Sequence, residues 1–146
     1  MNRQSCNLVA TCLLLSCSAA FPADQLMASL TEMFGAAGEY LAAGYQRSYL
    51  NQTSCGKFSK KATDPYQESL KDLSQTIRGD QLQELLKALE PAAPQLRQEV
   101  QGIVGAEPTP FNCGKAEGVL DASLRQSRGR WQSARAKFLS ATKAKQ

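Results

Sequence analysis

Apolar residues recur every three or four positions along most of this 146-residue chain. That spacing places them on one face of an α-helix. No run of alternating or β-branched residues is long enough to indicate a β-strand. The pattern therefore predicts an all-α protein, a small antiparallel bundle of about four helices that forms one domain over residues 24–146.

The first predicted helix runs from about Asp24 to Tyr49 and has two apolar stripes. The main stripe is Leu26, Leu30, Met33, Ala37, Leu41, Gly44 and Ser48, and the second is Met27, Phe34, Leu41, Tyr45 and Tyr49. Either the helix is central and touches two neighbours, or the amphipathic Tyr45 and Tyr49 belong to an exposed partner-contact surface. The glycines of this helix would let a neighbouring helix approach closely; they are Gly35, Gly38 and Gly44.

Capping residues mark the second predicted helix. Asp64 can cap its first turn, and Pro65 suits the first helical position. Gly79 is the type of residue that commonly ends a helix, so we expect the helix to end there. The polar stretch Asn51 to Thr63, which contains Cys55, is expected to be a loop.

The third predicted helix is interrupted by proline. Asp80 and Gln83 repeat the capping pattern at its start. Pro91 and Pro94 follow within its apolar pattern. Because an interior proline removes a backbone hydrogen bond and clashes with the preceding turn, we expect a break or kink near Glu90.

The last predicted helix has the most regular pattern in the chain. Its stripe is Leu120, Leu124, Ser127, Trp131, Ala134, Phe138 and Ala141. The central position of Trp131 in this stripe predicts that the indole lies in the core. The preceding stretch, Gly105 to Gly114 with Cys113, is expected to be a loop because it contains two prolines.

Residues 1–23 have the pattern of a secretory signal peptide. A basic residue, Arg3, precedes an apolar run over residues 8–15, and small residues follow. Cleavage is expected before Phe21 or Asp24, which would give a periplasmic or secreted protein. In the alternative, residues 14–17 resemble a bacterial lipobox, with Cys17 as the lipidated residue of an outer-membrane lipoprotein.

Two cysteines, Cys55 and Cys113, remain once the leader and its edge are set aside. In an oxidising compartment an even count predicts one disulfide, and the alternative is two unpaired thiols. The loop closed by this bond spans 58 residues, residue 113 minus residue 55. Closing it should stabilise the fold by about 4 kcal/mol through the unfolded state.

The chain contains no histidine, which restricts its chemistry. Histidine is the commonest general base and metal ligand near neutral pH, so a catalytic triad, an imidazole zinc site and a histidine-ligated haem are excluded. No glycine-rich phosphate loop or calcium-binding loop is present. We therefore expect no catalytic residues, no cofactor and no metal, and a protein that is not an enzyme.

Charge is unevenly distributed along the chain. Residues 115–146 carry eight basic and two acidic residues, a net of +6, whereas residues 24–114 carry eight basic and eleven acidic ones, a net of −3. Arg125, Arg128 and Arg135 lie to one side of the Trp131 stripe, with Arg130 on the other. These cations either pair with carboxylates on neighbouring helices or form a contact surface for an acidic protein or an anionic membrane.

These observations predict a binding protein rather than an enzyme. The expected function is that of an exported bacterial envelope protein, of the inhibitor, immunity or adaptor type, whose partner is another protein. The alternative is a lipid-anchored structural protein that touches membrane or cell wall through its basic last helix. Nucleic acid is not expected as a partner, because an exported protein seldom meets it.

Overall fold

The computed structural model describes residues 22–59 and 63–144. Its elements are α1 (Pro22–Gln52), the short 3-10 helix η1 (Ser54–Phe58), α2 (Pro65–Ser74), α3 (Gly79–Val104) and α4 (Pro110–Lys143). No strand occurs in these two ranges. The prediction of an all-α protein with four α-helices is confirmed.

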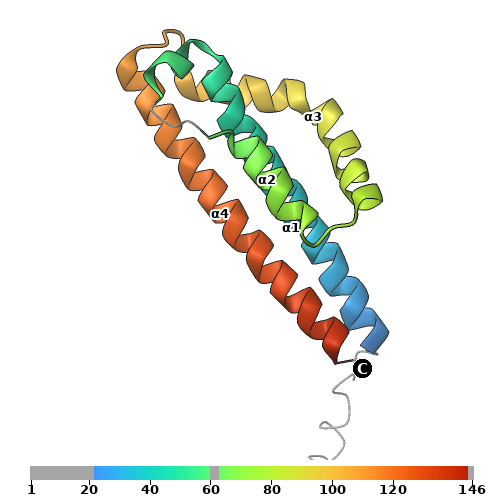
Figure 1. Cartoon of the computed structure of the whole chain (residues 1–146). Helices are drawn as coiled ribbons and strands as arrows, with labels where there is room; N and C mark the ends of the chain where they lie inside the picture. The colour runs from blue at the N-terminus through green and yellow to red at the C-terminus, as the bar shows by residue number, and fades with distance from the viewer. Residues whose placement is uncertain (1–21, 60–62, 145–146) are drawn as a thin grey trace, which may run out of the picture.

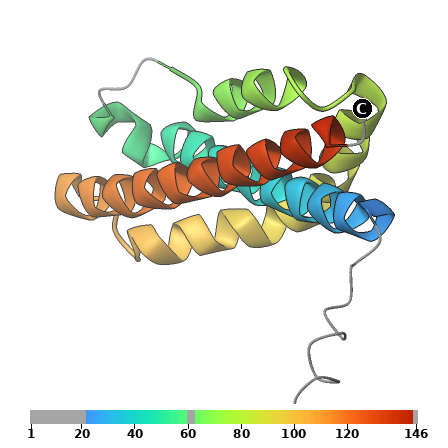
Figure 2. The same cartoon turned by 90° about the horizontal axis from the view of Figure 1, so that it is seen from below.

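The two longest helices, α1 and α4, lie side by side along the length of the molecule, and the start of α1 lies near the end of α4 (Figures 1 and 2). Ion pairs join them at successive levels. Lys137 Nζ lies 2.6 Å from Glu32 Oε1, and Arg130 NH1 lies 2.8 Å from Glu39 Oε2. Residue numbers therefore rise along α1 as they fall along α4.

The start of α2 agrees with the prediction. The Asp64 side chain caps the helix by accepting a hydrogen bond from the Tyr66 N–H at 3.0 Å, and Pro65 occupies the first turn. The end of α2 was predicted wrongly. The helix stops at Ser74, and the N–H groups of Thr76 and Ile77 both donate to the Leu73 carbonyl, which closes the last turn.

Gly79 is the first residue of α3 and does not end α2. Its φ is not positive, so it supplies no left-handed turn. Asp80 and Gln83 do not cap α3 either, since the N-cap residue is Arg78 and makes no side-chain capping bond. The chain turns from α2 into α3 so directly that Asp80 already lies in the first turn, where its charge favours the helix N-terminus.

The two prolines of α3 bend the helix without breaking it. Residues from Gly79 to Val104 form one helix that contains Pro91 and Pro94, and its bend is visible in Figure 1. Both prolines are exposed, so the carbonyls that lose an N–H partner are close to water.

Both expected cysteine loops are shorter than the sequence predicts. The Thr109 hydroxyl accepts a hydrogen bond from the Asn112 N–H at 3.2 Å, and Pro110 follows it, so α4 begins before Cys113. The connection between α3 and α4 is therefore residues 105–109. On the other side, Thr53 caps η1, which places Cys55 in a 3-10 helix.

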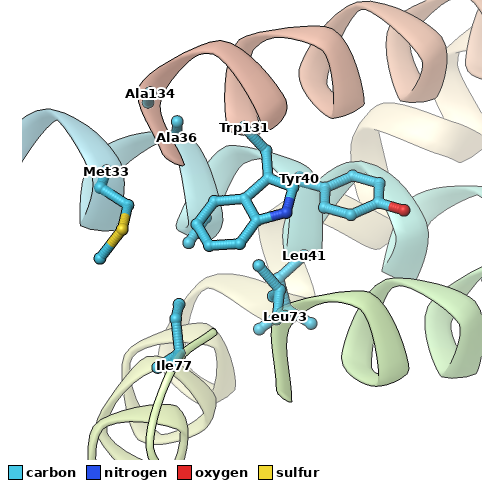
Figure 3. Close-up of a cluster of buried hydrophobic side chains, with 9 residues drawn as sticks. Met33, Ala36, Tyr40, Leu41, Leu73, Ile77, Trp131 and Ala134 are labelled. Atoms are coloured by element: carbon cyan, nitrogen blue, oxygen red, sulfur yellow. The ribbon is translucent and has the colours of Figure 1, made fainter. Parts of the chain in front are cut away.

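The larger core lies where α1, α2 and α4 face one another (Figure 3). Its buried members are Met33, Ala36, Ala37, Tyr40, Leu41, Leu73, Ile77, Trp131 and Ala134. Trp131 is 1% exposed, which confirms its predicted place in the core. Every residue of the predicted α4 stripe is buried or half-buried, so the stripe does face inward.

One α1 glycine lies at a close helix contact. A Cβ atom on Gly44 would lie 2.5 Å from Ser69 Oγ and 3.1 Å from the Pro65 carbonyl oxygen, so α2 can pack here only against glycine. Gly35 and Gly38 have no such neighbour within 4 Å. The close approach expected of all three therefore occurs at Gly44 alone.

Candidate functional site

The predicted disulfide between Cys55 and Cys113 is present, with the two Cα atoms 5.3 Å apart. It joins η1 to the first turns of α4, and both cysteines are 3% exposed. Around it lies a second apolar cluster, which also contains Leu50, Val100, Ala116 and Leu120. We call this region the disulfide end; it comprises η1, the last turns of α1 and α3, residues 105–109 and the first turns of α4.

A buried charge cluster crosses the molecule beside the disulfide end. Arg47 of α1 has a side chain with no exposed surface, and it forms ion pairs with Glu117 and with Asp121, the latter at 2.8 Å. NH1 donates to Asn51 Oδ1 at 2.6 Å, and NH2, which also pairs with Glu117, lies 3.5 Å from Ser59 Oγ. The guanidinium is thus held between two carboxylates, and the cluster links α1, α4 and the segment after η1.

Sequence reasoning missed Arg47, although two signals were present. Arg47 follows Gly44 by three positions and so continues the inward face of α1. Glu117 and Asp121 are the only acidic residues in the basic stretch 115–146, and they are four positions apart. Two carboxylates on one face of a basic helix indicate a cationic partner on a neighbouring helix.

A groove of about 410 Å³ opens at the disulfide end. Its lining residues are Tyr49, Gln52, Thr53, Ser54, Val100, Gln101, Val104, Gly105 and Pro108. The accessible apolar part comes from Val104 on α3 and from Pro108, since Val100 has no exposed surface, and amides and hydroxyls supply the polar part. This volume lies within the range of small-ligand and side-chain pockets, roughly 300–1,000 Å³.

Exposed aromatic rings lie at the same end. Phe111, in the first turn of α4, is 79% exposed and precedes the bonded Cys113 by two residues. Phe58, the last residue of η1, is 37% exposed, and Lys57 Nζ lies 4.9 Å from the centre of its ring. The backbone that carries both rings is tied down by the disulfide.

The predicted contact residues Tyr45 and Tyr49 are half-buried and turn toward α3. Arg97 NH1 donates to the Tyr45 hydroxyl at 2.9 Å, and Gln101 Nε2 donates to the Tyr49 hydroxyl at 3.2 Å. The Tyr45 ring also meets the Tyr66 ring edge to face, with centroids 5.8 Å apart. Of the two tyrosines, only Tyr49 lines the groove at the disulfide end.

The three predicted contact arginines of α4 have different surroundings. Arg125 is exposed. Arg128 pairs with Asp72 of α2, with its Nε 3.3 Å from Oδ2. Arg135 is half-buried, and its buried Nε has no hydrogen-bond acceptor among the described residues. The structure therefore does not gather these three side chains into one exposed patch.

Asp72 also accepts a hydrogen bond from the Tyr40 hydroxyl of α1 at 3.2 Å, so one carboxylate connects three helices. Burial raises the pKa of Tyr40 above its usual range, because the charged phenolate loses water contact there. Burial likewise raises the pKa of Tyr66, and the neighbouring Tyr45 and Asp64 add to the effect. Both phenols are therefore neutral at physiological pH, and the Tyr40 hydroxyl acts as a hydrogen-bond donor to Asp72.

Among the described residues, no group of three or more Cys, Asp or Glu side chains could hold a metal ion. No helix in the same ranges is both long and apolar enough to cross a membrane. Cys17, the candidate lipidation site, and the predicted cleavage site before Phe21 lie among residues 1–21, which are outside the described residues. The other predicted cleavage site, before Asp24, falls in the first turn of α1.

Comparison with protein-family models, with curated proteins and with solved structures found no match to this chain.

Proposed function

We propose that this chain is an exported bacterial envelope protein that binds another protein through its disulfide end. The observation that carries the proposal is Phe111, a ring 79% exposed at the same end as an open groove and on backbone fixed by a disulfide. Aromatic residues next to pockets are the usual anchors of protein interfaces. The predicted leader and the disulfide both fit an oxidising compartment outside the cytoplasm.

The proposed architecture behind this surface is an antiparallel bundle. In the ion pairs between α1 and α4, residue numbers rise along one helix as they fall along the other. The same holds for α1 and α2, where Ser48 bonds to Asp64 and Tyr40 bonds to Asp72. Along α1 and α3 they run in the same direction, with Tyr45 bonded to Arg97 and Tyr49 to Gln101. These directions support an up-down-up-down order, which brings the ends of α1 and α3 to the disulfide end.

A rigid surface suits a binding role. The disulfide and the Arg47 cluster hold η1 and the start of α4 in place before any partner arrives. A surface held in its binding conformation loses less conformational entropy on association, which increases the affinity.

The alternative, a lipid-anchored structural protein that uses a basic last helix, has less support. Arg128, Arg130 and Lys137 of α4 each pair with a carboxylate of α1 or α2, so part of the basic surface is neutralised within the chain. Lipidation at Cys17 is the feature that would favour this alternative.

The proposal is tested by photo-crosslinking in cells that express the protein. A photoreactive amino acid replaces Phe111 in one variant and Leu139 in the matched control, an apolar residue of the same helix that is 40% exposed near its far end. We expect a discrete crosslinked product from position 111 and a much weaker one from position 139. Equal products from both positions, or none from position 111, would contradict binding through the disulfide end.

A further inference from the structure

The first half of α3, residues 79–90, is held against the bundle less firmly than the second half, residues 91–104. Of the residues of α3, which all lie in the described ranges, only Val100 is buried, and it belongs to the second half. The first half faces the bundle with four leucines, none of them fully buried: Leu82, Leu85, Leu86 and Leu89. The fully buried anchor of this helix therefore lies beyond residue 90.

Side-chain hydrogen bonds follow the same division. Three bonds join the second half to α1: Arg97 with Tyr45 at 2.9 Å, Glu99 with Gln46 at 2.7 Å, and Gln101 with Tyr49 at 3.2 Å. Within the described part of the chain, no side-chain hydrogen bond or ion pair joins the first half to another helix. Its Lys87 pairs with Glu84 of the same helix, at 2.8 Å. Only apolar contacts therefore hold the first half in place.

Pro91 and Pro94 weaken the backbone connection between the two halves. In a regular helix the N–H groups of residues 91–94 donate to the carbonyls of residues 87–90. Proline has no N–H, so two of these four bonds are missing, at the bend of α3 visible in Figure 1. The first half can therefore lose its helical hydrogen bonds without disturbing those of the second.

Two hollows flank the leucines of the first half. One, of about 180 Å³, lies between α1 and α3, and all its lining side chains are apolar; Gly38 and Ala42 of α1 are among them. The other, of about 310 Å³, lies between the same leucines and two rings, Tyr45 and Tyr66. Atoms that line unfilled space lose dispersion contacts, so the leucines stabilise the closed position less than a close-packed seam would.

The first half also begins without a capping side chain. Its N-cap residue, Arg78, makes no side-chain bond to the first turn. Just before it, Ile77 is 3% exposed and belongs to the Trp131 core. The first half is thus a short helix between two fixed points, Ile77 and the second half. A helix of roughly 12 residues is marginal in water on its own, so this one depends on the contacts described above.

From the burial, the hydrogen bonds and the hollows together, we infer that residues 79–90 form a strap that opens from α1 and α2 as a unit while the rest of the bundle stays folded. Opening uncovers apolar surface that the closed protein hides, including Leu41, which is 1% exposed and lines the smaller hollow. The inference is independent of the proposed function, because no residue of the strap lines the groove at the disulfide end.

Native-state hydrogen exchange of the disulfide-intact protein tests the strap. We expect the amide of Leu86, corrected for its intrinsic rate, to exchange about 100-fold faster than that of Val100 in the same helix. Low concentrations of urea should accelerate exchange less at Leu86 than at Val100, because opening the strap exposes less surface than global unfolding does. Protection at Leu86 equal to or greater than that at Val100, or equal urea dependence of the two amides, would overturn the inference.

Matched proline variants test the division of α3. The double variant Pro91→Ala, Pro94→Ala supplies the two missing N–H groups, whereas Pro108→Ala changes a proline outside the helices. All three positions are exposed, so both proteins should fold. We expect exchange at Leu86 to slow about tenfold in the double variant, since the strap then opens only together with the second half, and to stay unchanged in Pro108→Ala. No slowing in the double variant, or equal slowing in both, would contradict a strap delimited by the prolines.

Discussion

Around Trp131 the helices meet through apolar side chains, whereas at the disulfide end they meet through a covalent bond and a charge cluster. The Trp131 core brings together Met33, Leu41, Leu73 and Ile77 with almost no exposed surface. The cluster at the disulfide end is smaller and includes the two bonded cysteines. Arg47 and its two carboxylates lie alongside it.

This difference follows from the backbone at each end. Near Trp131 the two longest helices, α1 and α4, continue past one another, so their polar backbone groups are bonded within the helices; α2 also ends there, and its last turn is closed by the Thr76 and Ile77 N–H groups that donate to the Leu73 carbonyl. At the disulfide end α1, η1 and α3 terminate and α4 begins. Helix ends leave polar groups that an apolar core cannot accommodate, so directional links hold this end together and a groove can remain open between them.

The largest expected effect is from Trp131→Ala, which tests the apolar region. Removing an indole that is 1% exposed between three helices should lower the free energy of unfolding by about 4–5 kcal/mol. Urea unfolding followed by circular dichroism measures this change. Phe111→Ala is the control, and its 79% exposed ring should cost little. A loss below about 2 kcal/mol for Trp131→Ala would show that the apolar region is not the main source of stability.

The next effect is expected from removing the disulfide. The double variant Cys55→Ala, Cys113→Ala should be destabilised by about 4 kcal/mol, because the unfolded chain regains the conformations of a 58-residue loop. Hydrogen exchange should become faster mainly in η1 and the first turns of α4. Faster exchange spread evenly over the Trp131 region would contradict the separation of the two ends.

A smaller loss, about 3 kcal/mol, is expected from Arg47→Ala, because the buried ion pairs of Glu117 and Asp121 with the guanidinium are broken. The two carboxylates are partly exposed, at 25% and 17%, which places the loss at the lower end of the range for buried pairs. The triple variant Arg47→Met, Glu117→Leu, Asp121→Leu should recover most of it, as thermal unfolding can show. A triple variant less stable than Arg47→Ala would mean that the charges themselves, and not their mutual compensation, stabilise this end.

The smallest effect concerns alkaline pH and belongs to the Trp131 region. Because burial raises the pKa of Tyr40 in the folded state, its contribution to stability is complete below the unfolded value of about 10 and is lost as the pH rises through the folded value. Stability should therefore fall more steeply above about pH 10 in the wild type than in Tyr40→Phe. If the free energy of unfolding, measured with urea, depends on pH equally in the two proteins, the pKa of Tyr40 is the same in the folded and unfolded states and the prediction is wrong.

Local sequence signals predicted the elements well where one residue decides the geometry. Asp64 and Pro65 begin α2 as expected, and the α4 stripe around Trp131 faces inward as expected. The wrongly predicted helix boundaries occur where a second local feature, close to the one used for the prediction, decided where the helix begins or ends. Thr109 with Pro110 starts α4 inside the stretch assigned to a loop, and Leu73 closes α2 before Gly79.

The candidate site was less predictable than the fold. The disulfide could be derived from the number of cysteines, since two cysteines allow one pairing. Tyr49 was singled out as a contact residue, and it does line the groove. The groove itself depends on where α1 and α3 end relative to each other, which involves contacts between residues about fifty positions apart.

The sequence by itself determined the helical class, the cysteine pair and the basic character of the last helix. The spacing of apolar residues, the number of cysteines and the charge of a segment do not depend on which distant segments are in contact. Only the tertiary structure decided that Arg47 is buried against Glu117 and Asp121, and that α1 and α3 end at one groove. The physical reason is that burial and electrostatic fields depend on which distant segments meet, and that choice is made by packing the whole chain.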